Sequence, residues 1–121
     1  MVYSLLKKVL RKDQLSVTET ELYRHSHDES AHTPVLPDVV AFPETTKDIQ
    51  AILQIANEHE AAVTAYGIGS GLEGQVIPLR KGISMNMERM NRIVTFSPED
   101  MTVTVEAGIT RSELNDKINR Y

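Results

Sequence analysis

The sequence contains no cysteine and no tryptophan, and its aromatic residues are limited to two phenylalanines and four tyrosines. Without cysteine, the chain cannot form a disulfide framework, a thiolate zinc site or a cysteine nucleophile. The scarcity of aromatic rings disfavours a platform on which nucleobases stack. The formal net charge of −4 provides no basic field, so we expect no nucleic-acid partner.

Long hydrophobic runs are also absent, which argues against a transmembrane helix. Basic residues at Lys7, Lys8 and Arg11 interrupt the first apolar segment, so it does not resemble a signal peptide. A length of 121 residues suits one small domain. The lack of cysteine fits a reducing compartment, and we expect a cytoplasmic location.

The apolar pattern divides the chain into an N-terminal helix and polar arm, residues 1–36, and a mixed region, residues 37–121. In the first part, five apolar residues recur at the spacing of one helix face and predict an amphipathic helix. These residues are Val2, Leu5, Leu6, Val9 and Leu10. The polar residues 13–37 predict a short helical turn and then a connecting arm.

The mixed region begins with the pattern of a strand, a helix and a second strand. An apolar strand is predicted at 39–42. Thr45 and Asp48 have the spacing of a capping box, which predicts a helix that ends near His59. The second strand is predicted at 61–65, parallel to the first because a crossover helix joins them.

Three further strands are predicted at 83–87, 93–96 and 102–105, with a turn between the last two. A second capping box, formed by Thr110 and Glu113, predicts a C-terminal helix. The chain then stops abruptly, so we expect a fragment of a longer protein. The predicted fold class is α/β (α+β), with a small sheet flanked by helices.

The most informative stretch runs from Tyr66 to Gly74 and holds four of the six glycines. Glycine permits positive φ angles, so successive backbone N–H groups can point at one anionic oxygen, and Ser70 adds a hydroxyl donor. The stretch matches neither the Walker loop nor G-x-G-x-x-G, which needs glycine at position 72 and a following helix. The pattern alone leaves two interpretations open, a phosphate-binding loop and a glycine-rich surface turn.

Four motifs in order resemble the N-terminal part of FAD-linked oxidases of the vanillyl-alcohol oxidase and p-cresol methylhydroxylase (PCMH) type. They are the strand and cap at 37–46, the loop at 66–74, Met90-Asn91-Arg92-Ile93, and the segment 105–110. The arm His27-Asp28-Glu29-Ser30 with His32 resembles the branch of cytochrome-linked D-lactate dehydrogenases and glycolate oxidase D subunits. The resemblance covers residues 20–121 and implies the first subdomain of a PCMH-type FAD-binding domain, truncated after residue 121.

The resemblance implies that FAD is the cofactor and that the glycine-rich loop contacts its pyrophosphate. The implied cofactor-binding residues are Tyr66, Gly67, Ile68, Gly69, Ser70, Gly71, Leu72 and Gly74. The resemblance places no catalytic residue and no metal ligand within this chain. One departure from the family is Glu60, which stands where glycine usually follows the helix.

By the same resemblance, the parent protein is an FAD-dependent dehydrogenase or oxidase that converts a D-2-hydroxy acid, D-lactate or glycolate, into a 2-oxo acid. The substrate would bind through a cap domain that this chain lacks. Electrons would pass to a cytochrome, a quinone or an iron–sulfur subunit. The fragment alone is expected to be inactive, and the parent complex is expected in the cytoplasm or peripherally on a membrane.

Two alternatives remain open at this point. The chain could be a non-catalytic, stand-alone module that binds a partner through a sheet edge or its terminal helix. A stable monomer would favour this module, whereas a truncated half-domain would expose apolar surface and self-associate. It could also belong to another FAD-dependent oxidoreductase of the same fold, such as a sugar oxidase.

Two smaller groups of residues have simple structural interpretations. Three histidines invite a metal hypothesis, but the weak periodicity of their segment favours an ordinary polar arm; they are His25, His27 and His32. Three methionines are expected to fill the core, namely Met85, Met87 and Met90.

Overall fold

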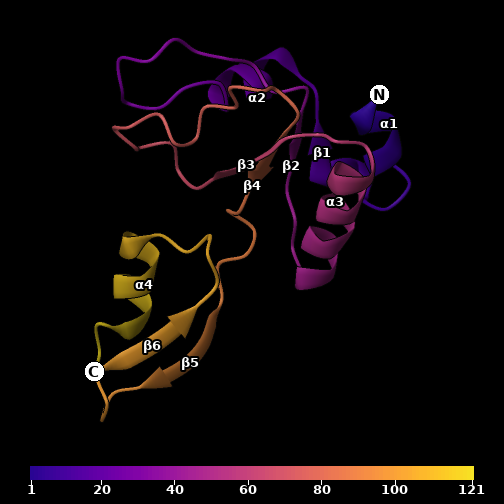
Figure 1. Ribbon diagram of the computed structural model, residues 1–121. Helices are drawn as coiled ribbons and strands as arrows, with labels where there is room; N and C mark the ends of the chain where they lie inside the picture. The colour runs from indigo at the N-terminus through magenta and orange to yellow at the C-terminus, as the bar shows by residue number, and fades with distance from the viewer.

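A four-stranded sheet organises the first three quarters of the molecule (Figure 1). The computed structural model describes all 121 residues. The strand order is β1-β2-β4-β3, where β1 is Leu15–Ser16, β2 is Val39–Ala41, β3 is Val63–Tyr66 and β4 is Ile83–Asn86. Strands β2 and β3 each pair in parallel with β4, and β1 adds to the edge of β2 in the antiparallel sense. The predicted mixed α/β fold, with small sheets flanked by helices, is confirmed.

The predicted strand–helix–strand unit is confirmed, with β4 inserted between its two strands. Helix α3, Thr46–Glu58, connects β2 to β3, and both strands run in the same direction. The capping box also forms, because the Thr45 hydroxyl accepts the Asp48 N–H and the Asp48 carboxylate accepts the Thr45 N–H. After the helix, Glu60 adopts a φ of 52°, the left-handed conformation that usually favours glycine.

The core lies between the sheet and helices α1 (Val2–Leu6) and α3. Its eleven buried residues include the three methionines, so their predicted role in packing is confirmed. All four residues of β4 are buried, as expected for the central parallel strand of a covered sheet. None of the helices is both long enough and apolar enough to cross a membrane.

The N-terminal part differs from its prediction in two ways. The amphipathic helix ends at Leu6 rather than Leu10, although Leu10 still reaches the core after a turn. The segment predicted as a helical turn and arm contains the short helix α2 (Glu19–Arg24), as expected, but the 3-10 helix η1 (Lys12–Gln14) and strand β1 precede it. Strand β1 has only two residues, too few for a period-two pattern to be visible in the sequence.

The C-terminal part forms a separate unit beside the sheet (Figure 1). Strands β5 (Ile93–Ser97) and β6 (Thr102–Val105) form an antiparallel hairpin, followed by helix α4 (Arg111–Ile118). Both strands, the turn between them and the second capping box confirm the sequence prediction. Tyr121 lies beyond the helix, where its ring packs edge-on against the ring of Phe96 with 5.1 Å between the ring centroids.

Candidate cofactor-binding loop

The glycine-rich loop leaves the sheet at the carboxyl end of β3. Parallel strands β2, β3 and β4 all end at this edge, and in open α/β sheets ligands bind outside the carboxyl ends of the strands. The fold therefore places the loop at the position where a bound anion is expected.

The loop presents a row of free hydrogen-bond donors. None of the seven backbone N–H groups from Gly67 to Glu73 donates to an acceptor within the chain, and the Ser70 hydroxyl also has no partner. Gly67, Ile68, Ser70 and Leu72 are exposed. Backbone N–H groups are obligatory donors, so a run of seven without protein acceptors is available to water or to an anionic ligand.

Tyr66 supports the first half of the loop from below. Its side chain is buried, and its hydroxyl donates a hydrogen bond to the Arg24 carbonyl oxygen at 3.3 Å. Gly69 adopts a φ of 75°, and a Cβ at this position would collide with the Tyr66 hydroxyl. Glycine is therefore required at 69 both for its backbone angle and for this close approach. The Tyr66 side chain therefore lies beneath the loop and is buried, while its role toward the cofactor stays a prediction.

A buried histidine lies beneath the same edge of the sheet. His25 is fully buried; its Nδ1–H donates to the Glu21 carbonyl at 2.8 Å, and its Nε2 accepts from the Asn86 amide at 2.9 Å. Its ring centroid lies 4.2 Å from that of Tyr66. Burial lowers the pKa of His25, which keeps the ring neutral and compatible with these two bonds.

The three histidines of the arm do not converge on one point. His25 packs under the loop, whereas the Nδ1 of His27 lies 3.0 Å from the Tyr23 carbonyl and His32 lies against Gly74. No group of three histidine or carboxylate side chains in the chain has the geometry of a metal site. Each histidine instead contacts neighbouring groups of the chain.

The second half of the loop contacts residues that precede the first parallel strand. Asp28 and Glu29, from the arm between α2 and β2, hydrogen-bond to Gly74 and Gly71. The sequence of this arm resembles the family, but its contact with the loop is not visible in the sequence. Only the fold brings the two segments together, since more than 40 residues separate Asp28 from Gly74.

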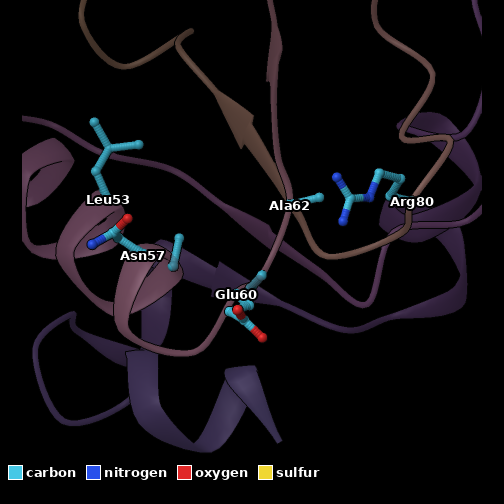
Figure 2. Close-up of a pocket in the computed structure, with 7 residues that line it drawn as sticks. Leu53, Asn57, Glu60, Ala62 and Arg80 are labelled. Atoms are coloured by element: carbon cyan, nitrogen blue, oxygen red, sulfur yellow. The ribbon is translucent and has the colours of Figure 1, made fainter.

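A hollow of about 620 Å³ lies at the opposite end of the parallel strands from the glycine-rich loop (Figure 2). Its labelled lining residues come from the C-terminal half of α3 and from the segments that lead into β3 and β4: Leu53, Asn57, Glu60, Ala62 and Arg80. These segments enter the strands at their amino ends, away from the glycine-rich loop. The hollow is therefore separate from the free amide donors.

The chain matches the family described as "FAD binding domain" over residues 37–121. It is 35% identical to the probable mitochondrial D-lactate dehydrogenase of Danio rerio, over 94% of this chain and 23% of that protein. It is 34% identical to the mitochondrial cytochrome D-lactate dehydrogenase of Arabidopsis thaliana, over 98% of this chain and 21% of that protein. It is 32% identical to glycolate oxidase subunit GlcD of Bacillus subtilis, over 70% of this chain and 18% of that protein. The chain thus spans about a quarter or less of the length of these relatives.

Solved structures show the same fold at lower identity. An alkyldihydroxyacetonephosphate synthase superposes with a TM-score of 0.87 at 22% identity, covering 98% of this chain and 24% of that one. p-Cresol methylhydroxylase superposes with a TM-score of 0.85 at 20% identity, again covering 98% and 24%. The predicted PCMH-type fold is confirmed by these likenesses.

Proposed function

This chain belongs to the FAD binding domain family, with FAD as its cofactor, and we propose that the loop from Tyr66 to Gly74 holds the pyrophosphate of that FAD. The observation that carries the proposal is the row of seven free backbone N–H groups at the carboxyl edge of the parallel strands. Tyr66 and Gly74 contribute as supports of the loop, whereas Gly67 to Glu73 supply the donors, with the Ser70 hydroxyl beside them.

The chemistry of these donors fits a pyrophosphate. Hydrogen bonds to an ionised acceptor are stronger than those between neutral groups, and several backbone amides in a row can share the two negative charges. The loop itself contains no lysine or arginine, and its one charged residue is Glu73. Recognition of the anion therefore depends on the backbone, which explains the requirement for glycine and the tolerance of Ile68 and Leu72 as exposed side chains.

For the whole protein, we propose oxidation of a D-2-hydroxy acid to a 2-oxo acid. The names of the relatives, D-lactate dehydrogenase and glycolate oxidase subunit, support this reaction class. A bound flavin supplies the redox chemistry by accepting a hydride equivalent. The part played by residues 66–74 is to bind and orient the cofactor. Substrate contacts and transfer of electrons to a cytochrome, quinone or iron–sulfur partner belong to other parts of such a protein.

The loop assignment can be tested with a variant that fills the site without disturbing the fold. An added Cβ at Gly67 meets nothing within 4 Å, and φ at Gly67 is not in the left-handed region. We expect Gly67→Val to weaken FAD binding at least about tenfold in titration calorimetry, because its side chain occupies the space of the pyrophosphate. Its melting temperature should match that of the wild type.

Ala107→Val serves as the matched control, because it adds bulk at an exposed position outside the loop. It should bind FAD with wild-type affinity. Equal affinity of the Gly67→Val variant and the wild type would contradict the placement of the pyrophosphate in this loop.

A second candidate function is self-association of the chain through its C-terminal unit. Met101 is 92% exposed and Tyr121 is 82% exposed, and both line one hollow of this unit, so their apolar surface is available to a second copy of the chain. Light scattering over a range of concentrations tests this candidate, which predicts a mass above 13.6 kDa. A constant monomer mass would contradict it.

A further inference from the structure

The second half of the glycine-rich loop is held by one carboxylate from the preceding arm. Asp28 is 7% exposed, and its Oδ2 accepts a hydrogen bond from the Gly74 N–H at 2.8 Å. Its Oδ1 accepts from the Ser30 N–H at 2.9 Å. Interactions with Ser30, followed by the bond from Gly74, lower the pKa of Asp28, so the carboxylate is ionised at neutral pH.

Two further contacts from the arm reach the same part of the loop. The Glu29 N–H donates to the Gly71 carbonyl oxygen at 3.0 Å. The His32 ring lies so close to Gly74 that it leaves no space for a Cβ, and Gly74 has a φ of 77°. These contacts use the carbonyl of Gly71 and the N–H of Gly74, and they leave the seven donors from Gly67 to Glu73 free.

We propose that Asp28 is a positioning residue for the cofactor, which fixes the loop in its anion-binding shape by holding the backbone of Gly74. This inference rests on the proposed function of the loop. Its physical basis is preorganisation: a loop already ordered in the binding conformation loses less entropy when the ligand arrives. The arm lies outside the matched residues 37–121, so this role is assigned by the contacts alone.

The direction in which FAD affinity changes when the Asp28 carboxylate is removed distinguishes a positioning role from charge repulsion. Asp28 carries a negative charge next to a loop that binds a negatively charged group. Its hydrogen-bond partners Ser30 and Gly74 each follow a further acidic residue in the sequence, Glu29 and Glu73. If charge repulsion dominated, removing the carboxylate would tighten the binding of FAD. If Asp28 positions the loop, its removal weakens binding despite the loss of a repulsive charge.

The chain also provides a matched control for the loss of such a bond. Asp38 makes the same kind of contact at the amino end of β4, where its Oδ2 accepts the Gly82 N–H at 2.9 Å and Gly82 has a φ of 73°. Both pairs therefore join an aspartate to the N–H of a glycine with positive φ. Only the pair with Gly74 lies at the loop, so Asp38→Ala reports the purely structural cost.

The test compares FAD binding by the wild-type chain, Asp28→Ala and Asp38→Ala in titration calorimetry, together with their amide NMR spectra without ligand. We expect Asp28→Ala to weaken FAD binding on the order of tenfold, the scale of one hydrogen bond to a charged group. In the free protein it should shift the amide signals of Gly71 to Gly74 and speed the hydrogen exchange of Gly74. Asp38→Ala should shift the signals around Gly82 and retain wild-type affinity.

Unchanged or tighter binding by Asp28→Ala, when the wild-type chain binds FAD, would overturn the role of Asp28 and leave the proposed function intact. Equal weakening by both aspartate variants would also overturn it, since the effect would then follow from general loss of stability. If the wild-type chain itself fails to bind FAD, the proposed loop function fails and the role of Asp28 fails with it. That outcome is recognised because the wild type and both variants then behave alike.

Discussion

Residues 1–90 and residues 91–121 are built in contrasting ways. The first region contains every buried residue of the chain, and the last of them is Met90. The second region has none, although it forms a regular hairpin and helix. The total accessible surface of 7967 Å² exceeds the roughly 6,600 Å² expected of a compact monomer of this mass. Both regions contain regular secondary structure, but only the first buries a core of its own.

Local interactions hold the second region in shape. The Arg92 guanidinium pairs with the Glu106 carboxylate at 2.7 Å across the hairpin. The Thr110 N–H donates to the Glu113 carboxylate at 2.7 Å at the start of α4. Such contacts join residues close in sequence, whereas the first region depends on contacts between distant segments such as α1 and α3. Substitutions that affect one region at a time test whether the two regions are stabilised independently.

The largest difference is expected from removing the same side chain in the two regions. Ile52 in α3 is fully buried, whereas Ile118 in α4 is only half-buried. We expect Ile52→Ala to lower the free energy of unfolding by about 2–5 kcal/mol, because it leaves a cavity. Ile118→Ala should cost less than about 1 kcal/mol. Urea denaturation measures both values, and similar losses would contradict the difference in packing.

The junction between the regions is expected to give the next largest effect. The Gly108 N–H donates to the Met90 carbonyl oxygen at 2.8 Å, and a Cβ at Gly108 would collide with the Met87 carbonyl oxygen. Since both contacts involve backbone, Gly108→Ala should cost about 1–3 kcal/mol. Hydrogen exchange should accelerate in β5 and β6 and stay unchanged in β4. Exchange that accelerates equally in all three strands would argue against a separable second region.

The two capping boxes provide a smaller, matched pair. Thr45→Ala and Thr110→Ala each remove a hydroxyl that accepts an N–H at 3.2 Å, a loss of about 1 kcal/mol. Buried residues hold α3 in place, whereas α4 has none. We therefore expect Thr110→Ala to unfold α4 locally, as measured by hydrogen exchange, while α3 stays protected in Thr45→Ala. Equal protection of both helices would show that α4 is held by more than its cap.

The smallest effect is expected from pH. A backbone hydrogen bond from Thr110 lowers the pKa of Glu113, and Arg92 lowers that of Glu106, both from an ordinary 4.5. A lowered folded-state pKa means that the stabilisation is complete above pH 4.5 and is lost as the pH falls through the lower folded value. Circular dichroism and hydrogen exchange should therefore show residues 91–121 loosening below about pH 4.5. Glu113→Gln should reduce the pH dependence in α4.

The same division explains how much of the fold could be predicted. The hairpin, both capping boxes and α3 were predicted because their signals lie within a few residues of each other. Strand β1 was missed and the first helix was predicted too long, because Leu10 and Leu15 reach the core through tertiary packing. The position of β4 between β2 and β3 likewise depends on pairing between distant segments.

The candidate site divides in a similar way. The glycine-rich loop could be found because its glycines are adjacent in sequence. The roles of Asp28 and Tyr66 beside the loop could not be found in this way. Asp28 contacts Gly74 across 46 positions, and the Tyr66 hydroxyl contacts the Arg24 carbonyl oxygen 42 positions away. The residues of the loop that contact FAD stay a prediction, and a direct measurement can test them.

That measurement is a titration of the 121-residue chain with FAD, followed through its backbone amide NMR signals. We expect the amides of Gly67 to Glu73 to shift most, because they are the free donors at the carboxyl ends of the parallel strands. The amide signals of residues that line the hollow at the amino ends of the strands, such as Asn57 and Arg80, should stay in place. Shifts confined to that hollow, or no shift in the loop at saturating FAD, would contradict the placement of FAD at the glycine-rich loop.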